Sequence, residues 1–150
     1  MIALPDEAAA DALGAAIADL LRPGDAIALS GPLGAGKTTL ARGILRGLGL
    51  AGEAPSPSFP IVIAYAPPEL RLPLWHVDLY RIEDADEIDE LGLDDARTDS
   101  VLLIEWPERM GGRLWPDMLR LALDDVADGG RRLTWVAPDA WDGRWPPPRR

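Results

Sequence analysis

The sequence predicts an α/β fold, in which a mostly parallel central sheet is flanked by helices and carries an antiparallel C-terminal hairpin. Two segments have apolar residues at helical spacing, and short apolar or β-branched runs are interspersed with helical segments along the chain. The chain has 150 residues, 47% of them hydrophobic, which is enough for one domain with a buried core. We expect this domain over residues 1–140, followed by a disordered Pro- and Arg-rich tail over 141–150.

The first helix is expected over residues 5–21, because apolar residues recur on one face of this segment. Asp6 suits the N-cap position, and Pro23 follows the end of the helix. The apolar run at residues 25–30 comes next, and its length and composition predict a buried strand.

A second helix is expected over residues 38–48, and Gly49 suits its C-terminal cap. The residues from 51 to 60 are rich in Pro, Ser and Gly, which predicts a loop. The rest of the chain predicts strands over 61–65, 72–79 and 101–104, a short helix within 83–95, a loop or single helical turn over 107–117, and a hairpin of strands 118–124 and 131–137.

The composition excludes several classes of function. The net charge of −10 disfavours direct nucleic-acid binding, because phosphate contacts need clustered Lys and Arg. The chain has no Cys, which excludes thiol chemistry and Cys-based zinc sites. There is no long apolar stretch that would span a membrane and no export signal, so we expect a cytoplasmic protein.

One motif carries chemistry by itself. Residues Gly31-Pro-Leu-Gly-Ala-Gly-Lys-Thr38 match the pattern G-x-x-x-x-G-K-[ST] at every fixed position, between a predicted strand and a predicted helix. In such a P-loop the backbone N–H groups and the helix N-terminus bind phosphates. Lys37 is then expected to reach the β- and γ-phosphates of ATP, and Thr38 to bind Mg²⁺. The expected nucleotide-binding residues of this segment are Gly31, Leu33, Gly34, Ala35, Gly36, Lys37, Thr38 and Thr39.

A P-loop site also needs a carboxylate that holds the Mg²⁺ or its waters, usually at the C-terminal end of a buried strand. Asp78 and Glu105 both follow such strands. Either acid is a candidate for the metal, and either is alternatively an exposed strand-end acid. His76 shares a strand face with Asp78, but a lone His is commonly a structural hydrogen-bonding group, so we assign it no chemistry.

The absences in the sequence favour ATP over GTP. GTPases usually read guanine with Asn-Lys-x-Asp, whereas this chain has no Asn or Gln and its one Lys is already in the P-loop. Two alternatives to an ATPase are a stand-alone small-molecule kinase, with Arg109 and Arg113 as lid residues, and a nucleotide-binding regulator that does not need hydrolysis.

Further motifs indicate a family. They are Gly34-Ala-Gly-Lys-Thr-Thr39, Ser56-Pro-Ser-Phe59, His76-Val-Asp-Leu-Tyr-Arg81, Glu90-Leu-Gly-Leu93 and Ile104-Glu-Trp-Pro-Glu108. In this order the chain resembles, over roughly residues 5–137, the bacterial tRNA threonylcarbamoyladenosine biosynthesis ATPases of the TsaE type.

The resemblance implies an ATP- and Mg²⁺-binding subunit that associates with the heterodimer of TsaD and TsaB, which modifies adenosine 37 of tRNA. It implies ATP hydrolysis, to ADP, that is weak alone and stimulated by that complex. By resemblance, Thr38 and Glu105 match Mg²⁺-associated positions and Asp78 matches a Walker B-like acid; Lys37, Asp78 and Glu105 are the catalytic candidates.

The resemblance also assigns residues outside the P-loop. Ser58 lies in a switch-like loop near the γ-phosphate, where the family commonly has Thr, and Arg131 matches a position near the base. Trp106 matches a functional aromatic residue, although core packing is the alternative. Ala10 stands where the family often has a Thr near the nucleotide. The acidic stretch 83–95 either docks on a basic partner surface or is a solvated helix.

Overall fold

The computed structural model describes residues 1–32, 36–52, 61–126 and 129–148. The strands are β1 (Ile2–Leu4), β2 (Ala26–Ser30), β3 (Val62–Tyr65), β4 (Leu74–Asp78), β5 (Val101–Glu105), β6 (Leu119–Asp125) and β7 (Arg131–Val136). The helices are α1 (Glu7–Ala18), α2 (Lys37–Gly47), α3 (Asp86–Asp89) and α4 (Leu93–Ala96), with 3₁₀ segments η1 (Pro107–Arg113) and η2 (Asp139–Trp141).

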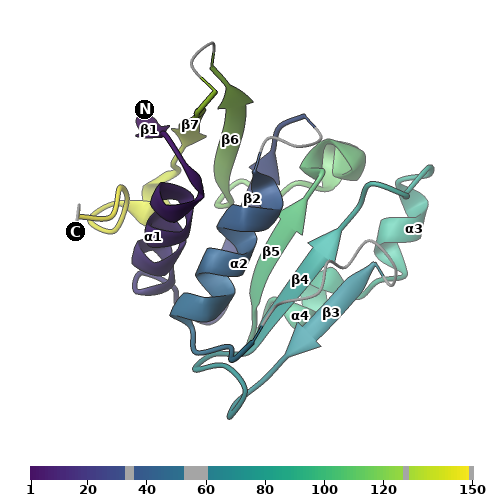
Figure 1. The fold of residues 1–150 in the computed structure, drawn as a ribbon. Helices are drawn as coiled ribbons and strands as arrows, with labels where there is room; N and C mark the ends of the chain where they lie inside the picture. The colour runs from purple at the N-terminus through teal and green to yellow at the C-terminus, as the bar shows by residue number, and fades with distance from the viewer. Residues whose placement is uncertain (33–35, 53–60, 127–128, 149–150) are drawn as a thin grey trace.

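All seven strands form one sheet, in the order β1-β7-β6-β2-β5-β4-β3 (Figure 1). The four inner strands, β6, β2, β5 and β4, run parallel to one another. Antiparallel strands flank them, with β3 at one edge and β7 followed by β1 at the other. The expected α/β class with a mostly parallel sheet is confirmed.

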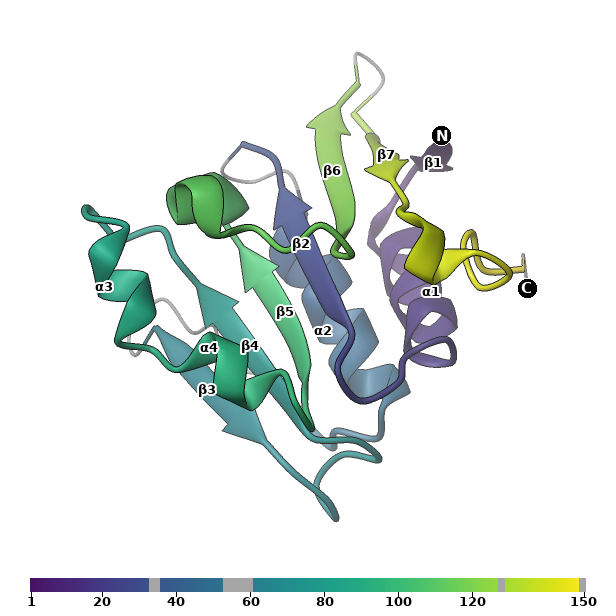
Figure 2. The same cartoon turned by 180° about the vertical axis from the view of Figure 1, so that it is seen from behind.

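Helices cover both faces of the sheet. α1 and α2 lie on one face, and α4 lies on the other, where η1 also packs (Figures 1 and 2). The side chains of β2 divide between the two cores, since Ile27 and Leu29 face α1 and α2 whereas Ala26 and Ala28 face α4 and η1. A strand buried on both faces reads as a continuous apolar run, which is why β2 and β5 were predictable from sequence.

The two long helices pack closely because glycines face each other. A Cβ added at Gly14 of α1 would lie only 2.6 Å from the carbonyl carbon of Gly43 in α2. A Cβ at Gly43 would lie 2.9 Å from the carbonyl oxygen of Asp11. Both distances are far below van der Waals contact, so this packing requires Gly at both positions.

The N-terminal prediction needs correction. The expected helix over 5–21 extends only from Glu7 to Ala18, although Asp6 caps it as predicted by accepting a 2.8 Å hydrogen bond from the Ala9 N–H. Before it lies the unpredicted strand β1, which pairs with β7. Consequently β1, not the C-terminal hairpin, forms that edge of the sheet.

The short helix expected within 83–95 is divided. Gly92 has a φ of 73° and separates α3 from α4. Because this left-handed conformation interrupts an α-helix, the glycine ends one helical turn and begins another. The prediction was therefore right in type and wrong in continuity.

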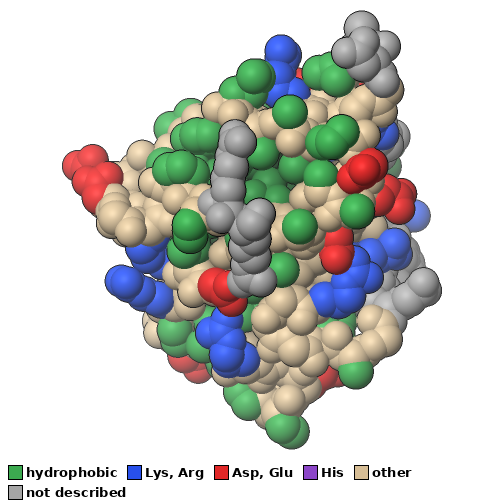
Figure 3. Space-filling view, turned by 60° about the vertical axis from the view of Figure 1, so that its left-hand side comes forward, with side chains coloured by type: hydrophobic (Ala, Val, Ile, Leu, Met, Phe, Trp, Pro, Cys, Tyr) green, Lys and Arg blue, Asp and Glu red, His purple; other side chains and the backbone are tan. Residues whose placement is uncertain are grey.

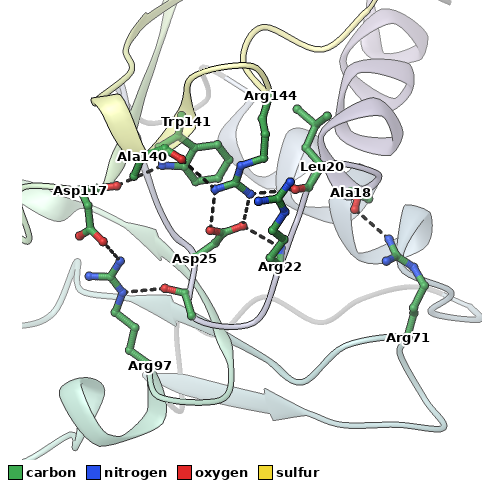
Figure 4. A network of polar contacts seen from close by, with 11 residues as sticks. Ala18, Leu20, Arg22, Asp25, Arg71, Arg97, Asp117, Ala140, Trp141 and Arg144 are labelled. Carbon is green, nitrogen blue, oxygen red and sulfur yellow. Dashed lines mark hydrogen bonds and ion pairs between the residues drawn. The ribbon is translucent and has the colours of Figure 1, made fainter.

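The C-terminal segment packs against the domain, which contradicts the disorder expected for 141–150 as far as residue 148. Trp141 is 1% exposed and donates a hydrogen bond from Nε1 to the Asp117 carbonyl oxygen (Figure 4). Arg144 forms a bidentate ion pair with Asp25 at 2.7 and 3.0 Å. Composition indicated disorder, but these contacts join residues 24 positions apart, for Trp141 and Asp117, and 119 positions apart, for Arg144 and Asp25, so local sequence does not show them.

An apolar groove lies beside this segment. It has a volume of about 370 Å³ and is lined by residues of β1, α1 and the C-terminal segment, among them Ile2, Leu13 and Pro147. Figure 3 shows hydrophobic side chains gathering on this side of the molecule. Among the described residues, no helix is both long and apolar enough to cross a membrane.

Candidate nucleotide site

The P-loop motif lies where the fold makes an anion site. It follows β2, and α2 begins at its Lys37. Gly36, the N-cap of α2, has a φ of 94° and provides no side-chain cap. The first-turn N–H groups of α2 therefore need another hydrogen-bond acceptor, and an anion such as a phosphate suits them. Leu33, Gly34 and Ala35 lie outside the described residues.

Lys37 is held over the site by two contacts. Its Nζ donates a 2.7 Å hydrogen bond to the Gly31 carbonyl oxygen and lies 3.7 Å from the centroid of the Trp106 ring. Burial lowers the pKa of Lys37, and the charges of Glu105, Glu108 and Asp78 partly oppose this effect. These acids favour the charged ammonium form, which is the form that makes charge-assisted hydrogen bonds to a phosphate.

Trp106 has an unusual backbone. Its φ of 60° is left-handed, a conformation that is strained for a bulky residue. This turn follows β5 directly and places the indole under Lys37 and 5.0 Å, between ring centroids, from Tyr80. Trp106 also packs against the core on the α4 face. The Trp106 side chain therefore both packs against the core and contacts the P-loop lysine.

The two candidate acids lie side by side. Asp78 ends β4, Glu105 ends β5, and they are direct partners in the parallel register. Both are buried, with exposed fractions of 9% and 4%. They share a sheet face with Leu103, which packs in the core under α1 and α2, so they face the side on which α2 begins. This position explains their electrostatic effect on Lys37.

In each of the two carboxylates, one oxygen has a hydrogen-bonding partner. Asp78 Oδ1 accepts a 2.9 Å hydrogen bond from the Tyr80 N–H, and Glu105 Oε2 lies 2.8 Å from His76 Nε2. Within the described residues, no hydrogen bond joins the other oxygen of either group. Burial raises the pKa of Asp78, and the Glu105 charge raises it further, against the opposing effects of Tyr80 N–H, His76 and Lys37.

These residues fit a divalent cation. Burial is the main cause of the raised pKa of Asp78, and repulsion from the neighbouring Glu105 carboxylate adds to it; a divalent cation would offset that repulsion. Carboxylate and hydroxyl oxygens are the ligands that Mg²⁺ prefers. Asp78, Glu105 and the Thr38 hydroxyl in the first turn of α2 are the groups that would hold it.

A pocket of about 200 Å³ lies beside the start of α2. Gly36 and Thr39 line one side, and the turn before β7 lines another, with Gly129, Gly130 and Arg131. The Arg131 side chain lies close to the P-loop, since its Nε is 3.8 Å from the position of a Cβ on Gly36. The segment from Leu4 to the start of α1 completes the pocket and includes Ala10.

The structure thus brings most of the predicted site residues to one end of the sheet. Lys37 contacts Gly31 and Trp106 directly. It also lies close enough to Asp78 and Glu105 for their charges to affect its pKa. Gly36, Thr39 and Arg131 line the adjoining pocket. Thr38 lies next to Lys37 in α2, whereas Ser58 is outside the described residues.

Sequence reasoning missed two features of the site. The pocket includes Leu4 to Glu7, which come together with Arg131 only because β1 pairs with β7. His76 contacts Glu105 directly, although the sequence related it only to Asp78. The alternation of side chains along β4 places His76 and Asp78 on one face, but only the register of β4 against β5 brings Glu105 to that face beside His76.

Residues 4–133 match the family described as Threonylcarbamoyl adenosine biosynthesis protein TsaE. The chain belongs to the TsaE family. It is 48% identical to a tRNA threonylcarbamoyladenosine biosynthesis protein TsaE from Streptomyces coelicolor, over 81% of this chain and 86% of the relative. A TsaE protein from Bacillus subtilis is 39% identical, over 77% of this chain and 72% of the relative.

A solved structure agrees with this assignment to TsaE. The crystal structure of Bacillus subtilis YdiB superposes with a TM-score of 0.79 at 30% sequence identity, covering 93% of this chain and 85% of that chain. The similarity therefore extends over nearly the whole chain. The matched family region contains the P-loop, both acids and Arg131.

Proposed function

We propose that the protein binds ATP and Mg²⁺ and hydrolyses the ATP, to ADP, in support of threonylcarbamoylation of adenosine 37 in tRNA. In this proposal it acts with partner proteins of the TsaD and TsaB type, and they, not this acidic chain, hold the tRNA. One observation carries the proposal: in a member of the TsaE family, a P-loop lysine lies within electrostatic reach of two buried, adjacent carboxylates.

Each residue then has a role. Gly36 and the first turn of α2 bind phosphate oxygens through backbone N–H groups, and Lys37 exchanges the Gly31 carbonyl oxygen for a phosphate oxygen. Asp78, Glu105 and Thr38 are the residues that would hold the Mg²⁺, and the bound ion would neutralise charge on the phosphates. The pocket beside Arg131 takes the nucleoside end of ATP.

The kinase alternative is not favoured. Arg113, a candidate lid residue, is held away from such a role by ion pairs of 2.8 Å with Asp86 and Asp89. The bidentate contact with Asp89 ties η1 to α3, which is the geometry of a structural pair. This pairing also uses part of the acidic charge in 83–95 that a basic partner surface would need.

The test is reconstitution of the modification reaction with TsaD, TsaB, tRNA, ATP and the threonylcarbamoyl donor. We expect the wild-type protein to let each complex modify many tRNA molecules, and Lys37→Ala to abolish this effect. Equal product with and without the protein would refute the proposed role. Glu105→Ala distinguishes the proposed ATPase from the regulator that does not need hydrolysis. A regulator requires that this variant still support the reaction, whereas the ATPase requires that it does not.

A further inference from the structure

We propose that His76 is a positioning residue that fixes the Glu105 carboxylate for metal binding, an inference that rests on the function proposed above. Sequence analysis assigned this histidine no chemical role. In the structure its Nε2 lies 2.8 Å from Glu105 Oε2, and the two side chains are 2% and 5% exposed. The contact joins β4 to β5, the two strands that end in the acids Asp78 and Glu105.

The surroundings of His76 show that this contact is its main polar interaction. Its Nδ1 is buried and has no hydrogen-bond partner among the described residues. Its neighbours in the strand registers are Ile63 in β3 and Leu103 in β5, both apolar. A buried structural histidine usually satisfies both ring nitrogens, since each unpaired polar atom costs free energy. Within the part of the chain that the structure describes, the ring makes one hydrogen-bonding contact, and its partner is the candidate metal ligand Glu105.

The chemistry of the pair sets the direction of the hydrogen bond. An ionised carboxylate accepts hydrogen bonds and cannot donate them, so Nε2 carries the hydrogen and donates it to Glu105 Oε2. This hydrogen bond occupies one carboxylate oxygen and restrains the rotation of the group. Oε1 is thereby left for the ligand of the site.

Such a restraint affects metal binding more than folding. Carboxylates that bind metals are typically held by further hydrogen bonds, and loss of these partners costs about 10- to 100-fold in metal affinity. Asp78 receives its equivalent restraint from the Tyr80 N–H, which no side-chain substitution removes. Glu105 depends for this restraint on the side chain of His76.

Two polar substitutions separate the positioning role from a structural one. In His76→Gln the side-chain amide nitrogen takes the place of Nε2 and can still donate to Glu105. In His76→Asn the amide lies near the place of Nδ1, where the imidazole has no partner, and does not reach the acid. Both variants bury an amide in the same apolar surroundings, so a purely structural role predicts similar effects for both.

The experiment measures binding of fluorescent ADP as Mg²⁺ is titrated, with binding in EDTA and the melting temperature as folding controls. We expect His76→Asn to raise the Mg²⁺ concentration for half-maximal effect by about tenfold or more, and His76→Gln to stay near wild type. ADP binding in EDTA should be similar in all three proteins. If His76→Asn does not fold, His76→Met replaces it, because Met fills a similar volume without a donor.

Each other outcome overturns the inference. Unchanged Mg²⁺ dependence in His76→Asn, even with a lower melting temperature, would assign His76 to structure alone. Equal losses in His76→Asn and His76→Gln would exclude the donated hydrogen bond. A wild-type protein whose ADP binding does not respond to Mg²⁺ would overturn the metal site itself, and so is distinguishable from a failure of His76 alone.

Discussion

The ammonium group of Lys37 lies 3.7 Å from the centroid of the Trp106 indole ring, in a cation–π contact. Trp106 reaches this position through a left-handed backbone conformation at the end of β5. Such contacts are worth about 0.5–2 kcal/mol, depending on desolvation. Because Lys37 is also the expected phosphate ligand, this contact links the indole to the state of the nucleotide site.

This relationship predicts an optical signal. When Lys37 moves toward a bound phosphate, the environment of the Trp106 ring changes, so ATP should alter the intrinsic fluorescence of the protein. Trp106→Phe should remove most of that change while preserving ATP binding within about tenfold. Trp115 provides the control, because its indole N–H donates a hydrogen bond to Asp94 and not to a residue of the P-loop. Trp115→Phe should therefore leave the signal intact. An undiminished signal in Trp106→Phe would contradict the coupling.

Asp78 should destabilise the metal-free protein. Burial raises its folded-state pKa above the unfolded value of 3.8, so the native state is favoured below that pH and loses stability as the pH rises through the raised pKa. Asp78→Asn keeps the acceptor for the Tyr80 N–H and removes the charge. We expect a higher melting temperature than wild type at pH 7 without Mg²⁺, and a loss of Mg²⁺-dependent nucleotide binding.

The exposed acid Glu83 is the matched control, since Glu83→Gln should change neither property. A lower melting temperature in metal-free Asp78→Asn would show that the carboxylate stabilises the fold.

Arg131 should contribute to binding of the nucleoside end of ATP. It lines the pocket with Gly36 and Thr39, whereas Arg132, next along β7, is exposed. We expect Arg131→Ala to weaken ATP and ADP binding by about three- to tenfold, or roughly 1 kcal/mol, as for the loss of one ordinary hydrogen bond. Arg132→Ala should have no effect in the same titration. Equal effects of the two substitutions would place the nucleoside elsewhere.

Gly14→Ala should destabilise the domain. The added methyl group would overlap the Gly43 backbone, where the nearest atom lies 2.6 Å away, so the helices must separate. Overpacking of this kind costs about 1–3 kcal/mol, measurable by urea unfolding. Since α1 also lines the pocket that we propose for the nucleoside, ATP binding should weaken in parallel. Gly112→Ala, with nothing within 4 Å of its added Cβ, should change neither.

Trp141→Ala should cost about 3–5 kcal/mol of unfolding free energy, as is typical when a large buried aromatic side chain is removed. The control is Val136→Ala, because Val136 is 62% exposed. Unchanged stability in Trp141→Ala would show that the C-terminal segment does not contribute to the core.

The predictable parts of this fold were those determined by short-range sequence. The motif between β2 and α2 placed Lys37 at a helix N-terminus, and the apolar runs of β4 and β5 placed Asp78 and Glu105 at strand ends. Parallel pairing then brings those ends together, so the acid pair followed from two local predictions and one rule of topology.

The missed parts depend on long-range contacts. β1 has only three residues and exists through pairing with β7, near the other end of the chain. Trp141 is buried by segments that precede it by many residues, including Asp117. The contact of His76 with Glu105 needs the register of two strands, which no single segment encodes. Ser58 remains a prediction.

The measurement that tests the central claim most directly is the rate of ATP hydrolysis, alone and with the TsaD–TsaB complex, with Lys37→Ala as the control. We predict a low rate alone, a strong increase with the complex, and no hydrolysis above background in Lys37→Ala under either condition. A rate that the complex does not change, or one that survives in Lys37→Ala, would contradict an ATPase that works through this P-loop with those partners.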